Sequence, residues 1–390
     1  MADRIQKIIG PRGTSYLVRV EYPPDPVTGK RRQRSKSFTT KKEAEKELVK
    51  WLHEIDTGMA VDTSKATIAE HMEAWLSTVA QHNVRPTTIA HYRATVKNHI
   101  VPRLGTVAVQ KVTPARIQAM YSEMLAEGKG ARTVQLAHLR LQQALSLAVQ
   151  WNIIARNPCD LVTSPRKQRK ELRTWNREDV RRFLDAANGD VYAPLWEMAL
   201  ATGMRRGELL GVRWQDIDLT RGTLTIQQAV TLLNDKAIIQ QPKSAASRRT
   251  VRLPAHCIAA LQAHKDRRSF RSSPATISDD ARDLVFTNTA GGIIHPRNLI
   301  RNFALIMEQE EKSRLAERPD DAPLPRIRFH DLRHTYATLS LSGGADIKTV
   351  SVRLGHSSIA ITGDVYMHVT PQMDERATAV IEDAIFGRVS

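Results

Sequence analysis

The spacing of hydrophobic residues changes along this chain, and each change limits what a segment can fold into. Residues 15–22 alternate between apolar and polar side chains, a period of two that predicts a strand. A second, basic strand is expected to end near Phe38. The capping-box pair Thr40 and Glu43 then opens a helix with an apolar stripe. Residues 1–62 are therefore predicted to form a small domain in which a sheet packs on one helix.

Two longer stretches are predicted to be mainly helical. Residues 66–162 show four helical segments, and the second of them is expected to stop before Pro102; the segments begin near Thr67, Pro86, Pro114 and Ala131. Residues 174–390 are again mostly helical and are interrupted by β-rich segments at 223–226, 237–240 and 249–253. The predicted fold class is mainly α with small β elements (α+β). At 390 residues the chain is too long for one core, so two or three domains are expected.

Three polar segments are predicted to lie outside the cores. Residues 163–173 form a basic, proline-bearing linker that either crosses a phosphate backbone or is only a solvated tether. Residues 267–283 and 308–325 are rich in charged side chains and turn formers, which indicates surface insertions.

The charge of the chain predicts a polyanionic partner. Lysine and arginine total 58 against 41 acidic residues, a formal excess of +17. Residues 1–42 hold eleven basic and three acidic residues, so they carry +8 of that excess. Such a footprint favours nucleic acid, although a basic enzyme that binds no polyanion is the alternative.

Other classes of protein are not indicated. The two cysteines, Cys159 and Cys257, are too few for a disulfide scaffold or a thiolate metal site. No signal peptide, membrane span or glycine-rich nucleotide loop is found, so a cytoplasmic protein that neither spans a membrane nor hydrolyses nucleotides is expected.

Six residues in the second half suit attack on a phosphodiester. Two arginines, a lysine and two histidines supply positive charge and proton donors, which can replace a metal ion at a transferring phosphoryl group. A tyrosine supplies a hydroxyl nucleophile, whose ordinary pKa of about 10 calls for a cationic site. The six are Arg205, Lys243, His330, Arg333, His356 and Tyr366.

The two arginines have the geometry for one phosphate. Two guanidinium forks can bind both non-bridging oxygens of a phosphodiester, and Arg333 shares a helix face with His330. Arg205 is expected near the N-terminus of a helix, where the helix dipole and free backbone N–H groups also favour the binding of phosphate. Taken singly, each arginine would be expected on the surface, and Tyr366 would be expected to pack in a core.

The motifs around these residues resemble the tyrosine recombinase family, and phage-type integrases in particular. The resemblance rests on Thr202–Glu208, Pro242–Ser244, His330–Thr335, Leu354–Ser358 and Asp364–His368, and spans residues 66–370. It departs from the family at Gly363, Val365 and the long insertion before His330.

The resemblance implies a role for each residue. Tyr366 would form a 3′-phosphotyrosyl link and free a 5′-hydroxyl, Lys243 would protonate the leaving oxygen, and His330 and His356 would exchange protons. Glu208 and Asp331 would orient these groups. DNA contacts are expected from Arg31, Arg32, Arg34 and Lys36 in the first domain and from Arg166 and Lys167 in the linker.

The implied function is site-specific recombination that integrates or excises a mobile element such as a phage genome, without cofactor, metal or ATP. Residues 1–62 would bind arm-type sites, 66–162 would bind core-type sites and 174–390 would be catalytic. A homotetramer on double-stranded DNA is expected in a bacterial nucleoid, with a host DNA-bending protein or an excision factor as further candidates. The tail helix after Tyr366 would exchange between neighbours or pack on its own domain.

Other functions stay open at this point. Type IB topoisomerase-like or Xer-like resolvase activity uses the same chemistry, and an idle DNA-binding regulator would keep only the fold. A zinc site is a further alternative, because His330 and His334 are spaced i, i+4 and either His356 or His368 would complete it. Asp331 stands where a metalloprotease would have glutamate.

Overall fold

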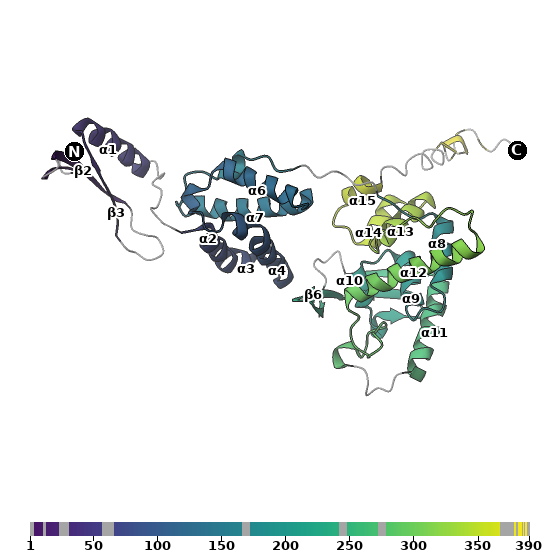
Figure 1. Cartoon of the computed structure of the whole chain (residues 1–390). Helices are drawn as coiled ribbons and strands as arrows, with labels where there is room; N and C mark the ends of the chain where they lie inside the picture. Colours follow the sequence, from purple (N-terminus) through teal and green to yellow (C-terminus); the bar gives the residue numbers. More distant parts are fainter. Residues whose placement is uncertain are drawn as a thin grey trace. The chain divides into compact units, whose positions relative to one another are not determined.

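A computed structural model of the chain describes residues 4–10, 13–22, 31–56, 66–165, 172–241, 248–271 and 278–366, with 378–379, 381–383, 385 and 387. Contacts divide the chain into two compact units, Met1–Arg169 and Lys170–Ser390 (Figure 1).

The N-terminal part is a three-stranded antiparallel sheet packed on one helix. Its strands, in the order β1-β2-β3, are β1 (Ile5–Gly10), β2 (Gly13–Tyr22) and β3 (Arg32–Phe38), and its helix is α1 (Lys41–Asp56). Val18 and Val20 of β2 are buried against Ala44, Leu48 and Trp51 of α1. The sheet and helix predicted from spacing are confirmed. Strand β1 was missed because its apolar residues do not alternate.

Some of the basic residues in and beside β3 that were expected to contact DNA also contact side chains of their own domain. Arg34 and Lys36 pair directly with Val20 and Val18, so they lie on the sheet face that α1 covers. The Arg34 guanidinium lies 4.4 Å from the centroid of the Trp51 ring. Arg31 forms an ion pair with Glu21. Part of the positive charge expected to contact DNA is therefore engaged within the domain, by Arg34 on Trp51 and by Arg31 on Glu21.

The second part of the first unit is a helical bundle. Thr67 and Glu70 form the expected capping box at its start, with the Thr67 amide donating to Glu70 Oε2 at 2.8 Å. Its core gathers apolar residues such as Ile68, Met72 and Leu141. The helices are α2 (Ile68–Trp75), α3 (Gln81–Asn83), α4 (Pro86–Thr95), α5 (Val101–Leu104), α6 (Pro114–Ala126) and α7 (Ala131–Gln150), with short 3₁₀ turns η4 (Val109–Lys111) and η5 (Pro158–Leu161).

The prediction that the second helix stops before Pro102 is wrong. After α4 the chain makes a π-helical turn, η3 (Val96–Ile100), and continues as α5. The π turn shifts the hydrogen-bond ladder, so Pro102 falls in the first turn of α5, a position where proline is well tolerated. A similar turn, η2 (Leu76–Ala80), follows α2.

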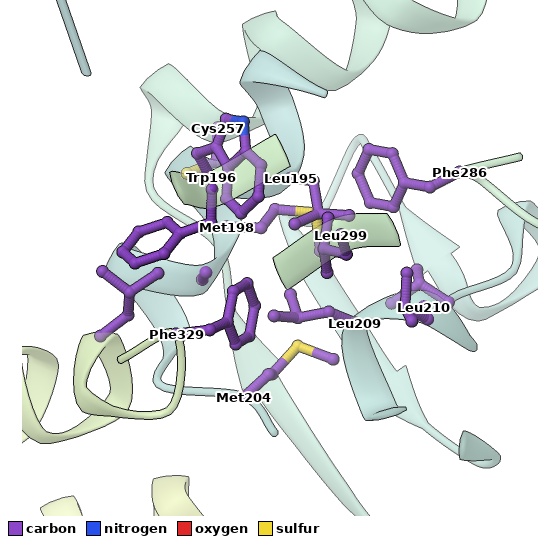
Figure 2. Close-up of a cluster of buried hydrophobic side chains, with 14 of the residues drawn as sticks. Leu195, Trp196, Met198, Met204, Leu209, Leu210, Cys257, Phe286, Leu299 and Phe329 are labelled. Atoms are coloured by element: carbon purple, nitrogen blue, oxygen red, sulfur yellow. The ribbon is translucent and has the colours of Figure 1, made fainter. Parts of the chain in front are cut away.

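The second unit is built around α9 (Ala193–Thr202), whose side chains are apolar on most sides. Trp196 and Met198 are fully buried and meet Phe329 and Leu209 in the core shown in Figure 2. The other helices are α8 (Arg177–Ala186), α10 (Arg206–Leu210), α11 (Ala255–Arg271), α12 (Pro296–Glu317), α13 (Asp331–Ser342), α14 (Ile347–Leu354) and α15 (Ile359–Tyr366), with η6 (Trp214–Asp216) and η9 (Asp279–Ala281).

The three predicted β-rich segments are strands, and they belong to two different sheets. β5 (Thr223–Ile226) pairs with β4 (Ile217–Asp218) and β8 (Arg249–Arg252), whereas β7 (Lys236–Gln240) pairs with β6 (Ala229–Leu233). Asn234 and Asp235 have φ of 48° and 63°, which suits a tight hairpin turn between β6 and β7. The connection from β7 to β8, which contains Lys243, therefore links two different sheets.

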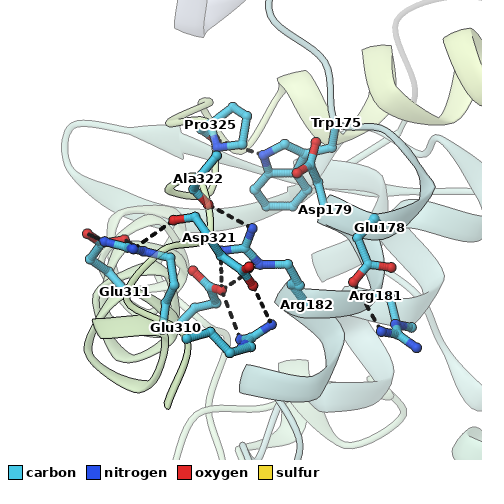
Figure 3. A network of polar contacts seen from close by, with 12 residues as sticks. Trp175, Glu178, Asp179, Arg181, Arg182, Glu310, Glu311, Asp321, Ala322 and Pro325 are labelled. Atoms are coloured by element: carbon cyan, nitrogen blue, oxygen red, sulfur yellow. Dashed lines mark hydrogen bonds and ion pairs between the residues drawn. The ribbon is translucent and has the colours of Figure 1, made fainter. Parts of the chain in front are cut away.

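The expected surface insertion at 308–325 is wrong in its first half. α12 continues to Glu317, and Glu310 and Arg314 are only 2% and 6% exposed. Glu310 binds Arg182 of α8 at 2.6 Å, and Arg182 also donates to the Ala322 carbonyl at 3.0 Å (Figure 3). Glu310 was expected on the surface because its partner Arg182 lies 128 positions away in the sequence.

Candidate active site

Arg205 lies at the N-cap of α10, between the end of α9 and the first turn of the next helix. Its backbone N–H donates to Glu208 Oε2 at 3.0 Å and its Nη1 donates to Glu208 Oε1 at 2.8 Å. Its Nη2 donates to the carbonyl oxygen of Gly355 at 2.9 Å. The side chain is 38% exposed, so the guanidinium is fixed on one side and open to solvent on the other.

Glu208 holds two arginines. Besides Arg205, it accepts from Arg249 Nη1 at 3.3 Å and Nη2 at 3.0 Å. Burial acts to raise the pKa of the Glu208 carboxyl, but Arg249 and then Arg205 outweigh burial and lower it below its ordinary value. Glu208 is thus an ionised, buried carboxylate that orients Arg205.

The sequence motifs did not mark Arg249 as a site residue; a basic residue at this position was expected to contact the DNA backbone or to carry surface charge, which its burial contradicts. Its side chain is 6% exposed. Within β8 the buried and exposed positions alternate, so Arg249 lies on the same face as buried Val251. That period of two was the signal that could have located it.

Arg333 is buried on the first turns of α13 and is 4% exposed. Its Nη1 donates to the carbonyl oxygen of Gly203 at 2.8 Å, two residues before Arg205. Gly203 has a φ of 63°, and a side chain there would come within 2.4 Å of Tyr336 Cδ1. Only glycine suits this close, left-handed turn.

His330 immediately precedes α13, and Asp331 fixes that turn. Asp331 accepts from the Arg328 amide at 2.8 Å and from the Arg328 guanidinium at 3.0 and 2.7 Å. Burial acts to raise the pKa of Asp331, but these bonds lower it. Asp331 therefore pairs with Arg328, which the sequence did not single out, and its charge also acts on His330. Desolvation and then Arg333 lower the pKa of His330.

His356 follows Gly355, which ends α14 with a φ of 66°. Its Nδ1 is 2.8 Å from the Thr362 hydroxyl on α15. Desolvation, followed by the charges of Arg333 and Arg205, lowers the pKa of His356 to about 4. The imidazole is therefore neutral at pH 7, and it is tied to the helix that ends at Tyr366.

Four of the six predicted residues meet. Arg205 and Arg333 act electrostatically on both His330 and His356, although the four lie on segments up to 151 positions apart in the sequence. Tyr366 is the last residue of α15, four positions after Thr362. The side chain of Tyr366 and all of Lys243, Arg166 and Lys167 lie outside the described residues, as do the Arg32 side chain and most of the tail.

A cavity of about 750 Å³ adjoins the site. Arg205 and His330 are among the residues that line it, together with apolar side chains such as Phe303, Met307 and Ile327.

Within the described residues, no three histidine, cysteine, aspartate or glutamate side chains group as a metal site. In the same part of the chain, no helix is long and apolar enough to cross a membrane.

Comparison with known families supports the resemblance to phage-type integrases that the motifs indicated. The phage integrase family matches residues 173–373, its N-terminal SAM-like domain matches 67–125, and an Arm DNA-binding domain matches 6–55. The chain is 31% identical to a XerC-like tyrosine recombinase of Caldanaerobacter subterraneus subsp. tengcongensis, over 88% of this chain and 90% of that protein. The chain belongs to the phage integrase family. This membership supports site-specific DNA recombination, which is the activity expected from the motifs.

Other members of the integrase family share its length and fold. The ICEBs1 integrase of Bacillus subtilis is 24% identical over 95% of this chain and 97% of its own. Among solved structures, the Tn1549 transposon integrase with a circular intermediate DNA matches with a TM-score of 0.68 at 19% identity, covering 80% of this chain and 99% of that chain. A lambda integrase tetramer on a Holliday junction matches with a TM-score of 0.60 at 17% identity, covering 92% and 94%.

Proposed function

We propose that this integrase cuts and rejoins DNA at attachment sites through a covalent phosphotyrosine, and so integrates or excises a mobile element. The observation that carries the proposal is the gathering of Arg205, Arg333, His330 and His356 beside the helix that ends at Tyr366. Residues 1–62, 66–162 and 174–390 would serve as the arm-binding, core-binding and catalytic domains, joined by the linker at 163–173.

The reaction balances without a cofactor. The Tyr366 hydroxyl oxygen attacks the scissile phosphorus, the bond from phosphorus to the 5′ oxygen breaks, and a 3′-phosphotyrosyl ester forms. The tyrosine proton passes to a neutral histidine, and Lys243 gives a proton to the leaving 5′ oxygen. The reverse steps join a new 5′-hydroxyl. One phosphodiester replaces another, so no ATP is consumed.

The site arginines supply the charge that a metal ion gives elsewhere. Arg205 and Arg333 are each fixed by a backbone carbonyl, so their remaining donors are oriented before DNA binds. The lowered pKa values of His330 and His356 favour neutral imidazoles, which can accept a proton at pH 7. We therefore expect cleavage to continue in EDTA.

Trapping the covalent intermediate tests the proposal. A duplex from the DNA flanking the gene, nicked so that the cleaved piece diffuses away, should accumulate a protease-resistant adduct with the native protein. Tyr366→Phe should bind this duplex and form no adduct. Tyr192→Phe, a half-buried tyrosine of the same unit outside the site, should still form it. An adduct with Tyr366→Phe would refute the assignment of Tyr366 as the nucleophile. Loss of cleavage in EDTA that only zinc restores would favour the metal alternative.

Two further parts of the proposal concern DNA partners. Removing residues 1–62 should abolish integration but spare cleavage at the core-type site, and arm-site affinity should fall steeply with salt because phosphate contacts release counterions.

The tetramer recorded for lambda integrase supports a four-protomer complex here. Truncation after Thr370 should leave folding intact and uncouple cleavage between protomers. Normal recombination without residues 1–62 would contradict the arm-binding role, and normal recombination by the protein truncated after Thr370 would contradict the coupling of protomers by the tail.

A further inference from the structure

We propose that Arg249 is a positioning residue for strand cleavage: it neutralises Glu208, so that the positive charge of Arg205 remains available to the scissile phosphate. The inference rests on the proposed function, because it assigns Arg205 to that phosphate. It concerns a residue outside the six that the motifs mark.

The contacts of Arg249 commit its side chain to the protein. Nη1 and Nη2 donate to the two oxygens of Glu208, and Nε donates to the carbonyl oxygen of Arg353 at 2.5 Å. With 6% of the side chain exposed, a guanidinium held by a carboxylate and a helix carbonyl is poorly placed to contact the DNA backbone directly. Its effect on the reaction must therefore pass through Glu208 or α14.

The charges around Glu208 explain why a second arginine is needed. Arg205 is 2.8 Å from Glu208 Oε1, and a carboxylate at that distance would cancel most of its charge if the two were alone. Arg249 lies 3.0 Å from the other oxygen. Two guanidinium groups thus share one carboxylate, and one positive charge is left over at the partly exposed member of the cluster, Arg205.

The same residue joins three elements of the site. Arg249 belongs to β8, Glu208 to α10, and the Arg353 carbonyl to the last turn of α14, where carbonyls lack helical partners. Arg353 donates in return from Nη2 to the Arg252 carbonyl at 3.0 Å. Arg353 precedes Gly355 and His356, so these bonds also fix the turn whose carbonyl holds Arg205.

The test compares two DNAs within one protein preparation. Full-length protein is mixed with the nicked core-site duplex carrying either the natural phosphodiester or an uncharged methylphosphonate at the scissile position, and the rate of adduct formation is measured on each. The ratio of the two rates does not depend on how much of a variant is folded. A neutral scissile group needs less positive charge, so a defect in the charge of Arg205 should appear mainly on the phosphodiester.

In Arg249→Met the ratio of phosphodiester to methylphosphonate cleavage should fall by at least about tenfold, less than the roughly 100-fold or more that a direct donor is worth. Arg249→Lys keeps the charge and should hold the ratio near the native value. Adding Glu208→Gln to Arg249→Met removes the carboxylate that competes for Arg205, so the ratio of phosphodiester to methylphosphonate cleavage should return towards the native value.

Arg314→Met is the matched control. Arg314 also binds one carboxylate with two nitrogens, Glu311 at 3.0 and 2.8 Å, and donates to backbone carbonyls, and its side chain is 7% exposed. It touches none of the site residues, so its loss should lower stability and leave the ratio unchanged. An unchanged ratio in Arg249→Met would overturn the inference. Absence of an adduct with the native protein on either DNA would instead overturn the proposed function itself.

Discussion

Arg205 and Gly355 are joined by a hydrogen bond of 2.9 Å from the guanidinium Nη2 to the glycine carbonyl oxygen. Gly355 directly precedes His356, so the turn that presents the histidine also holds the arginine. Arg333 is held in the same way by Gly203, which closes α9. Each of two left-handed glycines at a helix end therefore orients one arginine of the site.

Arg205→Lys should slow covalent adduct formation by roughly 100-fold or more, because a lysine cannot bond Glu208 and Gly355 at once and still present an oriented donor to phosphate. Binding to the same duplex, measured by fluorescence anisotropy, should change far less. Arg213→Lys is the control, since Arg213 forks on Asp216 at 2.7 and 2.9 Å outside the site. Equal loss in both variants would mean that the effect of Arg205 is structural.

Gly203→Ala should destabilise the second unit by well over the ~1 kcal/mol expected from backbone conformation alone. The added Cβ would meet Tyr336 Cδ1 at 2.4 Å and Leu354 Cδ2 at 2.7 Å, both in packed helices. Gly189→Ala is the matched control: Gly189 has a φ of 89° and no atom within 4 Å of an added Cβ. Denaturant unfolding measures both, and similar losses would show that the close packing at Gly203 is unimportant.

Glu310→Ala should cost about 3–5 kcal/mol, because it leaves the buried Arg182 without its carboxylate. The neighbouring pair Arg181–Glu178, at 3.1 Å on the same helix α8, is 70% and 57% exposed. Glu178→Ala should therefore cost less than about 1 kcal/mol. Figure 3 shows both pairs. Chemical denaturation of the two variants provides the measurement, and a cost below 1 kcal/mol for Glu310→Ala would contradict the buried-pair account.

Acidification should destabilise the catalytic unit, with His334 contributing. Desolvation, then His330 and Arg333, lower the pKa of His334 to about 4, against the opposing charge of Asp331; Arg328 also lowers it. An unfolded histidine takes up a proton near pH 6.5, so the stability that neutral His334 provides is complete above that pH and is lost as the pH falls towards 4.

The melting temperature of His334→Asn should therefore decrease less than that of the native protein between about pH 7.5 and about pH 5. His356, whose pKa is also about 4, keeps part of the dependence in the variant. Identical decreases in the two proteins would show that His334 titrates normally in the fold.

The sequence by itself determined the elements and the chemistry to look for. Spacing located β2, β3 and α1 of the first domain, the capping box at Thr67 and the strands β5, β7 and β8 of the catalytic unit, because burial of an apolar face and satisfaction of helix ends are local requirements. It did not locate β1, β4 and β6. The motifs marked Arg205, His330, Arg333 and His356, which the fold brings together. Their chemical roles, and those of Lys243 and Tyr366, stay predictions.

Only the tertiary structure decided which charges are buried and what they bind. Arg249 and Glu310 carry the same residue types as solvated surface, and their partners, Glu208 and Arg182, lie 41 and 128 positions away in the sequence. The helix through Pro102 and the pairing of β8 with β5 likewise depend on neighbours that no local window contains. Packing sets the environment of an ionisable group, and packing is a property of the folded chain.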